Sequence, residues 1–197
     1  MRIIAGSRKG RTIFSVSKDV HVKPISGRIR QSVFDMLRPY VTGSTFLDLY
    51  AGIGAVGLEA LSRGAASVVF VEKAGICLKT IEKNIASLGF QENAKALKAD
   101  ILTGLKWLEH YADYKGYDII FLSPPYRDED NLPLSYTART LALIDEGGIM
   151  GPGCLVVAQH HKTEKIDIPP ALRKVRQVKY GDTLVDFIRK AEPGTPG

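Results

Sequence analysis

Short apolar segments alternate with helical patterns along most of the chain. The candidate strands lie at 46–50, 68–71, 94–97, 119–122 and 154–158. Runs of this length, separated by segments in which apolar residues recur every three or four positions, are typical of βαβ units. The pattern therefore predicts an α/β fold built on a mostly parallel sheet.

The segments between the strands show the periodicity of helices that cover a sheet. One of them has apolar residues at three- and four-residue steps, namely Leu78, Ile81, Ile85 and Leu88. Gly89 follows, where a C-terminal cap is expected. We expect two further helices at 101–112 and 132–144.

The first forty residues have a different pattern. Extended pieces at 2–5 and 12–16 flank a turn at 6–10, and an amphipathic helix follows whose apolar face carries Ile29, Val33, Leu37 and Val41. This segment is predicted to form a small β-hairpin and helix extension ahead of the sheet.

The other end of the chain predicts an antiparallel edge. Two strands, at 174–180 and 183–188, are separated by Gly181 and Asp182, a pair that suits a tight hairpin turn. We expect a single domain over 1–190, with an extension at 1–41 and a core at 44–190. The glycine- and proline-rich residues 191–197 are expected to be a loose tail.

Charge is distributed unevenly. The 197 residues are 45% hydrophobic and 24% charged, as in an ordinary soluble domain, and the net charge is +6. Residues 1–40 carry nine cations and two acids, which is +7, so the rest, with 18 cations and 19 acids, is −1. A solvated basic face would account for the excess, but its concentration in one segment favours contact with phosphates.

Several site classes find no support in the sequence. Cys77 and Cys154 lie far apart and are read as packing residues, and the adjacent His160 and His161 would point to opposite faces of a strand. We therefore expect no metal. No apolar run is long enough to span a membrane and no signal-type segment opens the chain, so a cytoplasmic protein that does not bind membranes is expected. The oligomeric state stays open.

Ser123-Pro124-Pro125-Tyr126 directly follows the apolar run at 119–122. Proline has no N–H, so a buried strand that ends in two prolines leaves carbonyl groups without local donors. With a small polar side chain before it and an aromatic ring after it, this corner could bind the amino group of a planar base and stack on the base. A simple proline turn explains the tetrapeptide equally well.

A glycine-rich loop follows the first central strand. Gly52, Gly54 and Gly57 form G-x-G-x-x-G between a strand and a helix, the context in which this fingerprint binds nucleotide cofactors. Glu72, at the end of the next strand, could accept hydrogen bonds from ribose hydroxyls. Dinucleotides and S-adenosylmethionine both use such a loop.

Two further acids help to separate these cofactors. Asp48, on the strand before the loop, could pair with the ammonium of S-adenosylmethionine, whereas a pyrophosphate offers it no partner. Asp100 could accept from an adenine amino group while Ile101 packs on the ring. Asp48 could instead be satisfied by backbone amides of its own loop, and Asp100 could cap a helix.

In order and spacing, these motifs resemble class I S-adenosylmethionine-dependent methyltransferases that modify amino groups. More narrowly, the chain resembles the RsmD-type 16S rRNA guanine-N2 methyltransferases over about residues 1–190. The narrower match rests on the opening MRIIAG with KGR, on the segment at 28–37, on GLEALSRGA at 57–65 and on YGDT at 180–183.

The resemblance implies a Rossmann-like sheet, S-adenosylmethionine as cofactor, and 16S rRNA or the 30S particle as partner. It implies that the amine lies against Ser123, Pro124 and Tyr126. The implied cofactor residues are Asp48, Tyr50, Gly52, Gly54, Glu72, Lys73, Asp100 and Ile101. The implied RNA-binding residues are Arg8, Lys9, Arg11, Lys23, Arg28 and Arg30.

The chain departs from the family pattern at three places. Ser123 stands where aspartate is usual, Lys23-Pro24-Ile25 replaces Arg-Pro-Thr, and 159–161 reads Gln-His-His where an acid is common. Alternatives are methylation of adenine N6 or of a protein glutamine, and a non-catalytic module that binds RNA or assists ribosome assembly. A dinucleotide dehydrogenase would leave the Ser-Pro-Pro-Tyr corner unexplained.

Overall fold

The computed structural model describes residues 1–17, 25–127 and 132–191, and it divides into two compact units, Met1–Ile101 and Leu102–Gly197. Lys23 and the predicted tail beyond Ala191 lie outside the described residues. Each unit contains part of the predicted strand pattern, and the two are described in turn.

The first unit is built on three parallel strands with the order β3-β2-β1. The strands are β1 (Thr45–Leu49), β2 (Ser67–Glu72) and β3 (Ala94–Lys98). Its helices are α1 (Gly27–Val41), α2 (Ala55–Ser62) and α3 (Gly75–Leu88). The strands and α3 confirm the predicted elements, and Gly89 closes α3 in the left-handed conformation with φ 73°.

The N-terminal segment is attached to this unit mainly by side chains rather than by strand pairing. Its two extended pieces pair with each other through the antiparallel bridge of Arg2 to Thr12, and the N–H of Ile3 donates to the Arg11 carbonyl at 3.0 Å. The buried carboxylate of Glu59 on α2 accepts from the backbone N–H groups of Ile4 at 2.8 Å and Ala5 at 3.0 Å. Asn84 on α3 bonds both the N–H and the carbonyl of Phe14. Buried polar groups therefore hold the segment in place.

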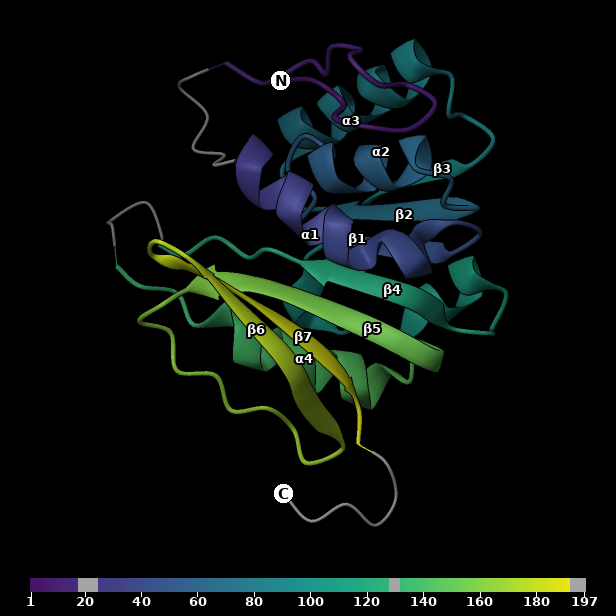
Figure 1. Cartoon of the computed structure of the whole chain (residues 1–197). Helices are drawn as coiled ribbons and strands as arrows, with labels where there is room; N and C mark the ends of the chain where they lie inside the picture. Colours follow the sequence, from purple (N-terminus) through teal and green to yellow (C-terminus); the bar gives the residue numbers. More distant parts are fainter. Residues whose placement is uncertain (18–24, 128–131, 192–197) are drawn as a thin grey trace. The chain divides into compact units, whose positions relative to one another are not determined.

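The second unit continues the α/β pattern and ends in antiparallel strands, with the order β4-β5-β7-β6. Its strands are β4 (Tyr117–Leu122), β5 (Met150–His161), β6 (Leu172–Tyr180) and β7 (Thr183–Lys190), and its α-helix is α4 (Tyr136–Gly147). β4 and β5 are parallel, whereas β5, β7 and β6 pair antiparallel. Figure 1 shows β6 and β7 as a long hairpin beside β5. The mostly parallel pattern with an antiparallel hairpin edge is confirmed.

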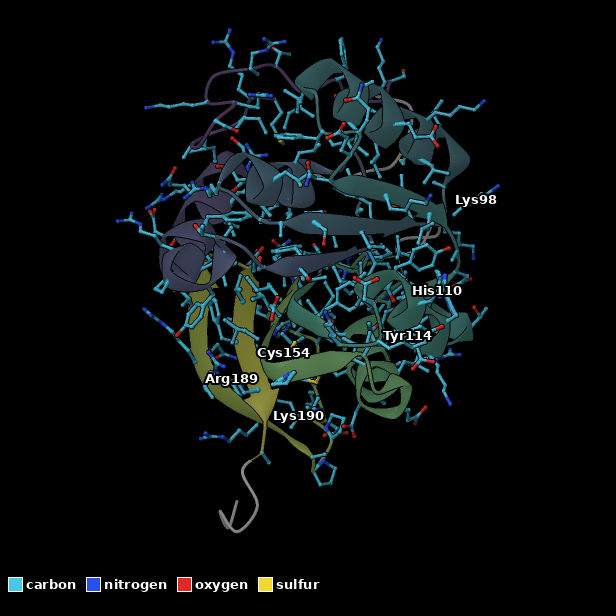
Figure 2. The ribbon with its side chains drawn as sticks, turned by 90° about the vertical axis from the view of Figure 1, so that its right-hand side faces the viewer. Lys98, His110, Tyr114, Cys154, Arg189 and Lys190 are labelled. Atoms are coloured by element: carbon cyan, nitrogen blue, oxygen red, sulfur yellow. The ribbon has the colours of Figure 1, made fainter. Side chains whose placement is uncertain are left out.

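Two predicted helices differ from the structure. The segment at 101–112 forms two 3₁₀ pieces, η1 (Ile101–Thr103) and η2 (Lys106–Ala112), because Gly104 lies between them at φ 118°. η2 ends where Asp113 and Tyr114 both adopt positive φ, and Tyr114 then packs edge-on against His110 at the surface (Figure 2). α4 begins at Tyr136 instead of 132, since Pro133 first forms a bridge with Arg127.

Candidate functional site

The glycine loop lies in the first unit between β1 and α2. Gly52 and Gly54 have φ of 56° and 80°, the left-handed region that favours glycine. Tyr50 shares that region at φ 59°, which is unusual for a bulky residue and marks backbone strain at the entrance to the loop. Gly52 is half-buried and Gly54 is buried, so the loop offers little side-chain bulk at Gly52, where a nucleoside could approach the backbone.

The third glycine of the motif has a packing role. A Cβ on Gly57 would lie 2.3 Å from the ring of Phe70 and 2.7 Å from Val68, both on β2. Only glycine allows α2 to approach the strand this closely. Its N–H donates to Asp48 at 2.9 Å, so the same position also connects helix and strand through a buried carboxylate.

The two acids beside the loop are both bonded to backbone. Glu72 accepts from the N–H groups of Gly52 and Ala74, each at 2.8 Å. Asp48 is 2% exposed, and burial, with a smaller contribution from the nearby charge of Glu72, raises its pKa to about 8, against the effect of the Gly57 bond. The sequence allowed Asp48 to be satisfied by a backbone amide instead of a ligand, and the bond from Gly57 is of this kind. A protonated Asp48 is neutral and needs no cationic partner, whereas the ionised form of this buried residue would need one.

Three predicted cofactor residues, Lys73, Asp100 and Ile101, lie just beyond the ends of β2 and β3. Asp100 forms an ion pair with Lys73 at 2.7 Å, and Lys73 is largely exposed. Ile101 begins η1 and is 3% exposed. Lys73 and Asp100, both predicted cofactor residues, therefore meet at the ends of β2 and β3.

The Ser-Pro-Pro-Tyr corner lies in the second unit, directly after β4. Ser123 is half-buried, Pro124 is buried and Tyr126 is half-buried. The backbone N–H of Leu134 donates to the Tyr126 carbonyl at 2.9 Å, and the ring of Tyr126 lies 5.8 Å from that of His161. Burial raises the pKa of the Tyr126 hydroxyl, so this group stays protonated.

Gln159 on β5 connects the two polar groups of the corner, a role that the sequence did not reveal. Its Nε2 donates to Ser123 Oγ and to Tyr126 Oη, both at 3.0 Å. Gln159 is 6% exposed, and its Oε1 has no partner among the described residues. A buried acceptor without a donor costs about 1–3 kcal/mol. In the sequence, Gln159 is a polar residue at the end of the apolar strand that comes next along the chain after the corner.

The predicted RNA-binding cations differ in how they are used. Arg8 donates to the Leu88 carbonyl at 2.6 Å and lies over the Phe90 ring, so it holds the N-terminal segment against α3. Arg11 donates to the Ser87 carbonyl at 3.2 Å but stays exposed. Lys9 and Arg28 are exposed.

Arg30 is a correction to the predicted RNA-binding set. The residue is 1% exposed and donates to the carbonyls of Arg2 and Ala55, and its Nε lies 3.8 Å from the Glu59 carboxylate. Burial lowers its pKa and the Glu59 charge raises it. The signal was present in the sequence: positions 30, 34, 37 and 41 form one helical stripe, and the other three are apolar. Arg30 is therefore a core residue.

No group of three or more potential metal ligands is present in the described part of the chain. Nor does any helix within those residues have the length and apolar character needed to cross a membrane.

Comparisons with known proteins agree with this arrangement. A family model described as "Conserved hypothetical protein 95" matches residues 1–189. The chain is 32% identical over 195 residues to the "Putative rRNA methyltransferase YlbH" of Bacillus subtilis (strain 168), covering 96% of this chain and 99% of that protein. It is 28% identical over 173 residues to the "Ribosomal RNA small subunit methyltransferase D" of Escherichia coli (strain K12), covering 87% and 80%.

A solved structure shares the fold. The "Putative methyltransferase yhhF from Escherichia coli" superimposes with a TM-score of 0.79 at 25% identity, over 96% of this chain and 97% of that chain. Together with the strand pairings, this likeness shows a class I methyltransferase fold.

Proposed function

The chain belongs to the RsmD family, and from this premise we propose that it transfers a methyl group from S-adenosylmethionine to N2 of a guanine in 16S rRNA. Curated relatives named as small-subunit rRNA methyltransferases support the RNA substrate. The single observation that carries the site assignment is the hydrogen-bonded cluster of Ser123, Tyr126 and Gln159 at the end of a buried strand.

The cofactor assignment rests on the glycine loop and its acids. S-adenosylmethionine combines ribose hydroxyls, which donate hydrogen bonds, with a cationic ammonium group. Glu72 is half-buried beside Gly52, and the buried Asp48 lies at the base of the same loop. Glu72 suits hydroxyl donors and would repel a pyrophosphate, and Asp48 suits an ammonium group because a neighbouring cation favours its ionised form. The residues present therefore fit S-adenosylmethionine better than a dinucleotide.

The chemistry at the corner is an in-line displacement. When bound, S-adenosylmethionine supplies an electrophilic methyl group. The guanine amine attacks with its lone pair, so the N–C bond forms as the S–C bond breaks, and sulfur retains that electron pair as a neutral thioether. The methylated nitrogen then loses a proton to water. The corner must orient the amine, because an aryl amine has a delocalised lone pair and is a weak nucleophile.

Ser123 and Gln159 provide this orientation in place of the aspartate of the family pattern. The Ser123 hydroxyl has two lone pairs, and Gln159 Nε2 donates to one of them, so the other can accept from the amine. Gln159 Oε1 is a second buried acceptor, and it lacks a donor among the described residues. The Pro124 carbonyl is a third acceptor for the amine. The Tyr126 ring stacks on the base.

Transfer of a labelled methyl group tests the substrate. We expect label in 16S rRNA, either naked or in 30S particles, and N2-methylguanine in its nuclease digest. Label in adenine N6 or in a protein glutamine would replace the proposed substrate by one of the alternatives. Tight cofactor binding without transfer to RNA, DNA or protein would indicate a binding module.

Substitutions at the corner test the mechanism. Tyr126→Ala removes the stacking surface, worth about 1–3 kcal/mol per base, so the transfer rate should fall about 10- to 100-fold while cofactor affinity is retained. Tyr126→Phe is the matched control: it keeps the ring, removes the hydroxyl with its bonds to Gln159 and Thr183, and should reduce the rate less. Equal losses of rate and cofactor affinity in Tyr126→Ala would show that the ring contacts the cofactor instead.

Proton release tests the role of Asp48. Because its pKa is about 8 in the free protein, the carboxyl is mostly protonated at pH 7. Pairing with the cofactor ammonium favours the ionised form, so binding should release a proton, and calorimetry in buffers of different ionisation enthalpy measures this release. Asp48→Asn should bind more weakly and release none. The same proton release from Asp48→Asn would assign it to another group.

A further inference from the structure

The β6–β7 hairpin carries a second basic surface. β6 has four cations and no acid among its nine residues: Arg173, Lys174, Arg176 and Lys179. All four are exposed. The net charge of residues 41–197 does not reveal this strand, because acids elsewhere in that part of the chain balance its cations.

Strand register separates these cations by face. Residues that are directly opposite in antiparallel strands share a face of the sheet. Arg173 pairs with Arg189 and Arg176 pairs with Phe187, so these three arginines lie on one face. Lys174 and Lys179 pair with Ile188 and Leu184 on the other face. Figure 2 shows Arg189 and Lys190 near the end of β7.

The arginine face is also the face of the Ser-Pro-Pro-Tyr corner. Tyr180 pairs with Thr183, and Thr183 in turn pairs with His161 on β5. Gln159, two residues before His161, shares this face and bonds Ser123 and Tyr126. A continuous row therefore leads from the corner across β5 and β7 to β6. Tyr180 is about 10 Å from His161 by strand spacing, and Arg176 is about 14 Å further along β6.

A backbone hydrogen bond orients Arg189. Its guanidinium donates to the Gly153 carbonyl at 2.6 Å, which holds the group at this end of β7, on the same face as Arg173. Guanidinium groups gathered on one face form a surface of positive charge that attracts a phosphate.

The other face differs in its charge balance. Buried Asp186 accepts from Gln177 at 2.7 Å and lies 3.6 Å from Lys174. Its carboxylate therefore offsets cationic charge on that face, whereas the β7 positions of the arginine face (Thr183, Val185, Phe187 and Arg189) include no acid.

We propose that Arg173, Arg176 and Arg189, hereafter the hairpin arginines, bind backbone phosphates of the substrate RNA several nucleotides from the modified base. This inference rests on the proposed function, since it assumes that the base is delivered to the corner by RNA. About 10 Å across the strands and about 14 Å along them make a span of about 17 Å from His161 to Arg176, which corresponds to about five nucleotides at about 3.4 Å per nucleotide of a stacked strand. The surface binds phosphate and carries no sequence specificity of its own.

Edge strands also carry charge to prevent aggregation, and cations on either face serve that purpose. The decisive experiment therefore compares two substitutions on one strand. Arg176→Gln removes a cation from the corner's face, and Lys179→Gln removes one exposed cation from the opposite face. Both lower the net charge of the protein by one, so a non-specific electrostatic effect would be the same in both.

The measurement is the dependence of 16S rRNA affinity on salt. Removing one cation that neutralises a phosphate should make the slope of log K against log salt shallower by about 0.7–0.9. We expect this change in Arg176→Gln, about twice the change in the double variant Arg173→Gln/Arg176→Gln, and no change in Lys179→Gln. Calorimetry should show the same S-adenosylmethionine affinity in all of them.

The outcomes distinguish this inference from the proposed function. If wild-type protein transfers methyl groups to rRNA but Arg176→Gln and Lys179→Gln have equal slopes, the hairpin arginines are not a phosphate site. If the variants lose affinity for 30S particles only, with unchanged slopes on naked RNA, the partner is a ribosomal protein and the RNA assignment is wrong. If the wild type binds S-adenosylmethionine but methylates no RNA, the proposed function fails first. Should the double variant unfold, Arg176→Gln alone decides.

Discussion

Two basic regions of this protein use their cations in opposite ways. In the N-terminal segment, Arg8 holds the chain against α3, and Arg30 is buried beside Glu59. On β6 the cations are exposed and sorted by face. The N-terminal segment has the larger charge excess, yet part of that charge is committed to structure. Net charge in a sequence window therefore does not measure the charge available to a polyanion.

The largest expected effect is that of removing Glu59. Glu59→Ala would leave Arg30 without its acidic partner and the Ile4 and Ala5 amides without their acceptor. Removing one partner of a buried ion pair typically costs about 3–5 kcal/mol, and we expect a loss of this size in the free energy of unfolding by urea. Glu82→Ala, on the exposed face of α3, is the control and should change little. A loss below about 1 kcal/mol would mean that the N-terminal segment is not held through Glu59.

The hairpin has its own buried acid, and its pH dependence tests the other side of the comparison. Burial opposes ionisation of Asp186, but hydrogen bonds from His160 and Gln177 and the charge of Lys174 lower its pKa below the usual value. A depressed pKa stabilises the fold above the unfolded pKa of about 3.9, and this stability is lost as the pH falls through the native value.

Asp186→Asn should therefore cost about 1–3 kcal/mol at pH 7 and progressively less as the pH is lowered below 4, as measured by urea titrations across this range. Asp167→Asn, at an exposed position before β6, serves as the control and should follow the wild-type curve. A cost that does not vary with pH would assign the role of Asp186 to its shape, not its charge.

Arg8 should contribute to stability and not to RNA binding. Arg8→Gln removes the bond to Leu88 and the contact with Phe90, so we expect a loss of about 1 kcal/mol in unfolding free energy. The salt slope of RNA binding should be unchanged, in contrast to Arg176→Gln. A shallower slope with full stability would place Arg8 among the phosphate contacts and weaken the contrast between the two regions.

The smallest expected effect is at Lys9, the exposed neighbour of Arg8. Lys9→Gln should leave unfolding unchanged and, if this residue contacts phosphate, reduce the salt slope by about 0.7–0.9. Filter-binding or fluorescence titrations over a range of salt concentrations measure it. An unchanged slope would leave the hairpin as the main phosphate-binding surface.

Much of the fold could be predicted because its signals are local. The apolar strands, the periodic face of α3 and the Gly181-Asp182 turn each require only a few neighbouring residues. The segment at 101–112 was mispredicted as one helix, since Leu105 and Leu108 fit a helical stripe while Gly104 interrupts the backbone. Local apolar spacing does not reveal such a break.

The site was partly predictable for a related reason. The glycine loop and the Ser-Pro-Pro-Tyr corner are contiguous motifs, so their residues could be found by reading along the chain. Gln159 is 33 residues beyond Tyr126 and becomes significant only when β5 pairs with β4. Arg30 shares a helical stripe with Phe34, Leu37 and Val41, and this position, not its charge, determines its burial.

Glu59 contacts the backbone of the N-terminal segment and not its side chains. The two donors in this contact are the main-chain N–H groups of Ile4 and Ala5. Any residue except proline supplies the same donor. The two positions can therefore vary in side chain without loss of this contact, while the acid that receives them cannot. Among related sequences, such a partnership would show as one invariant acid without any covarying residue.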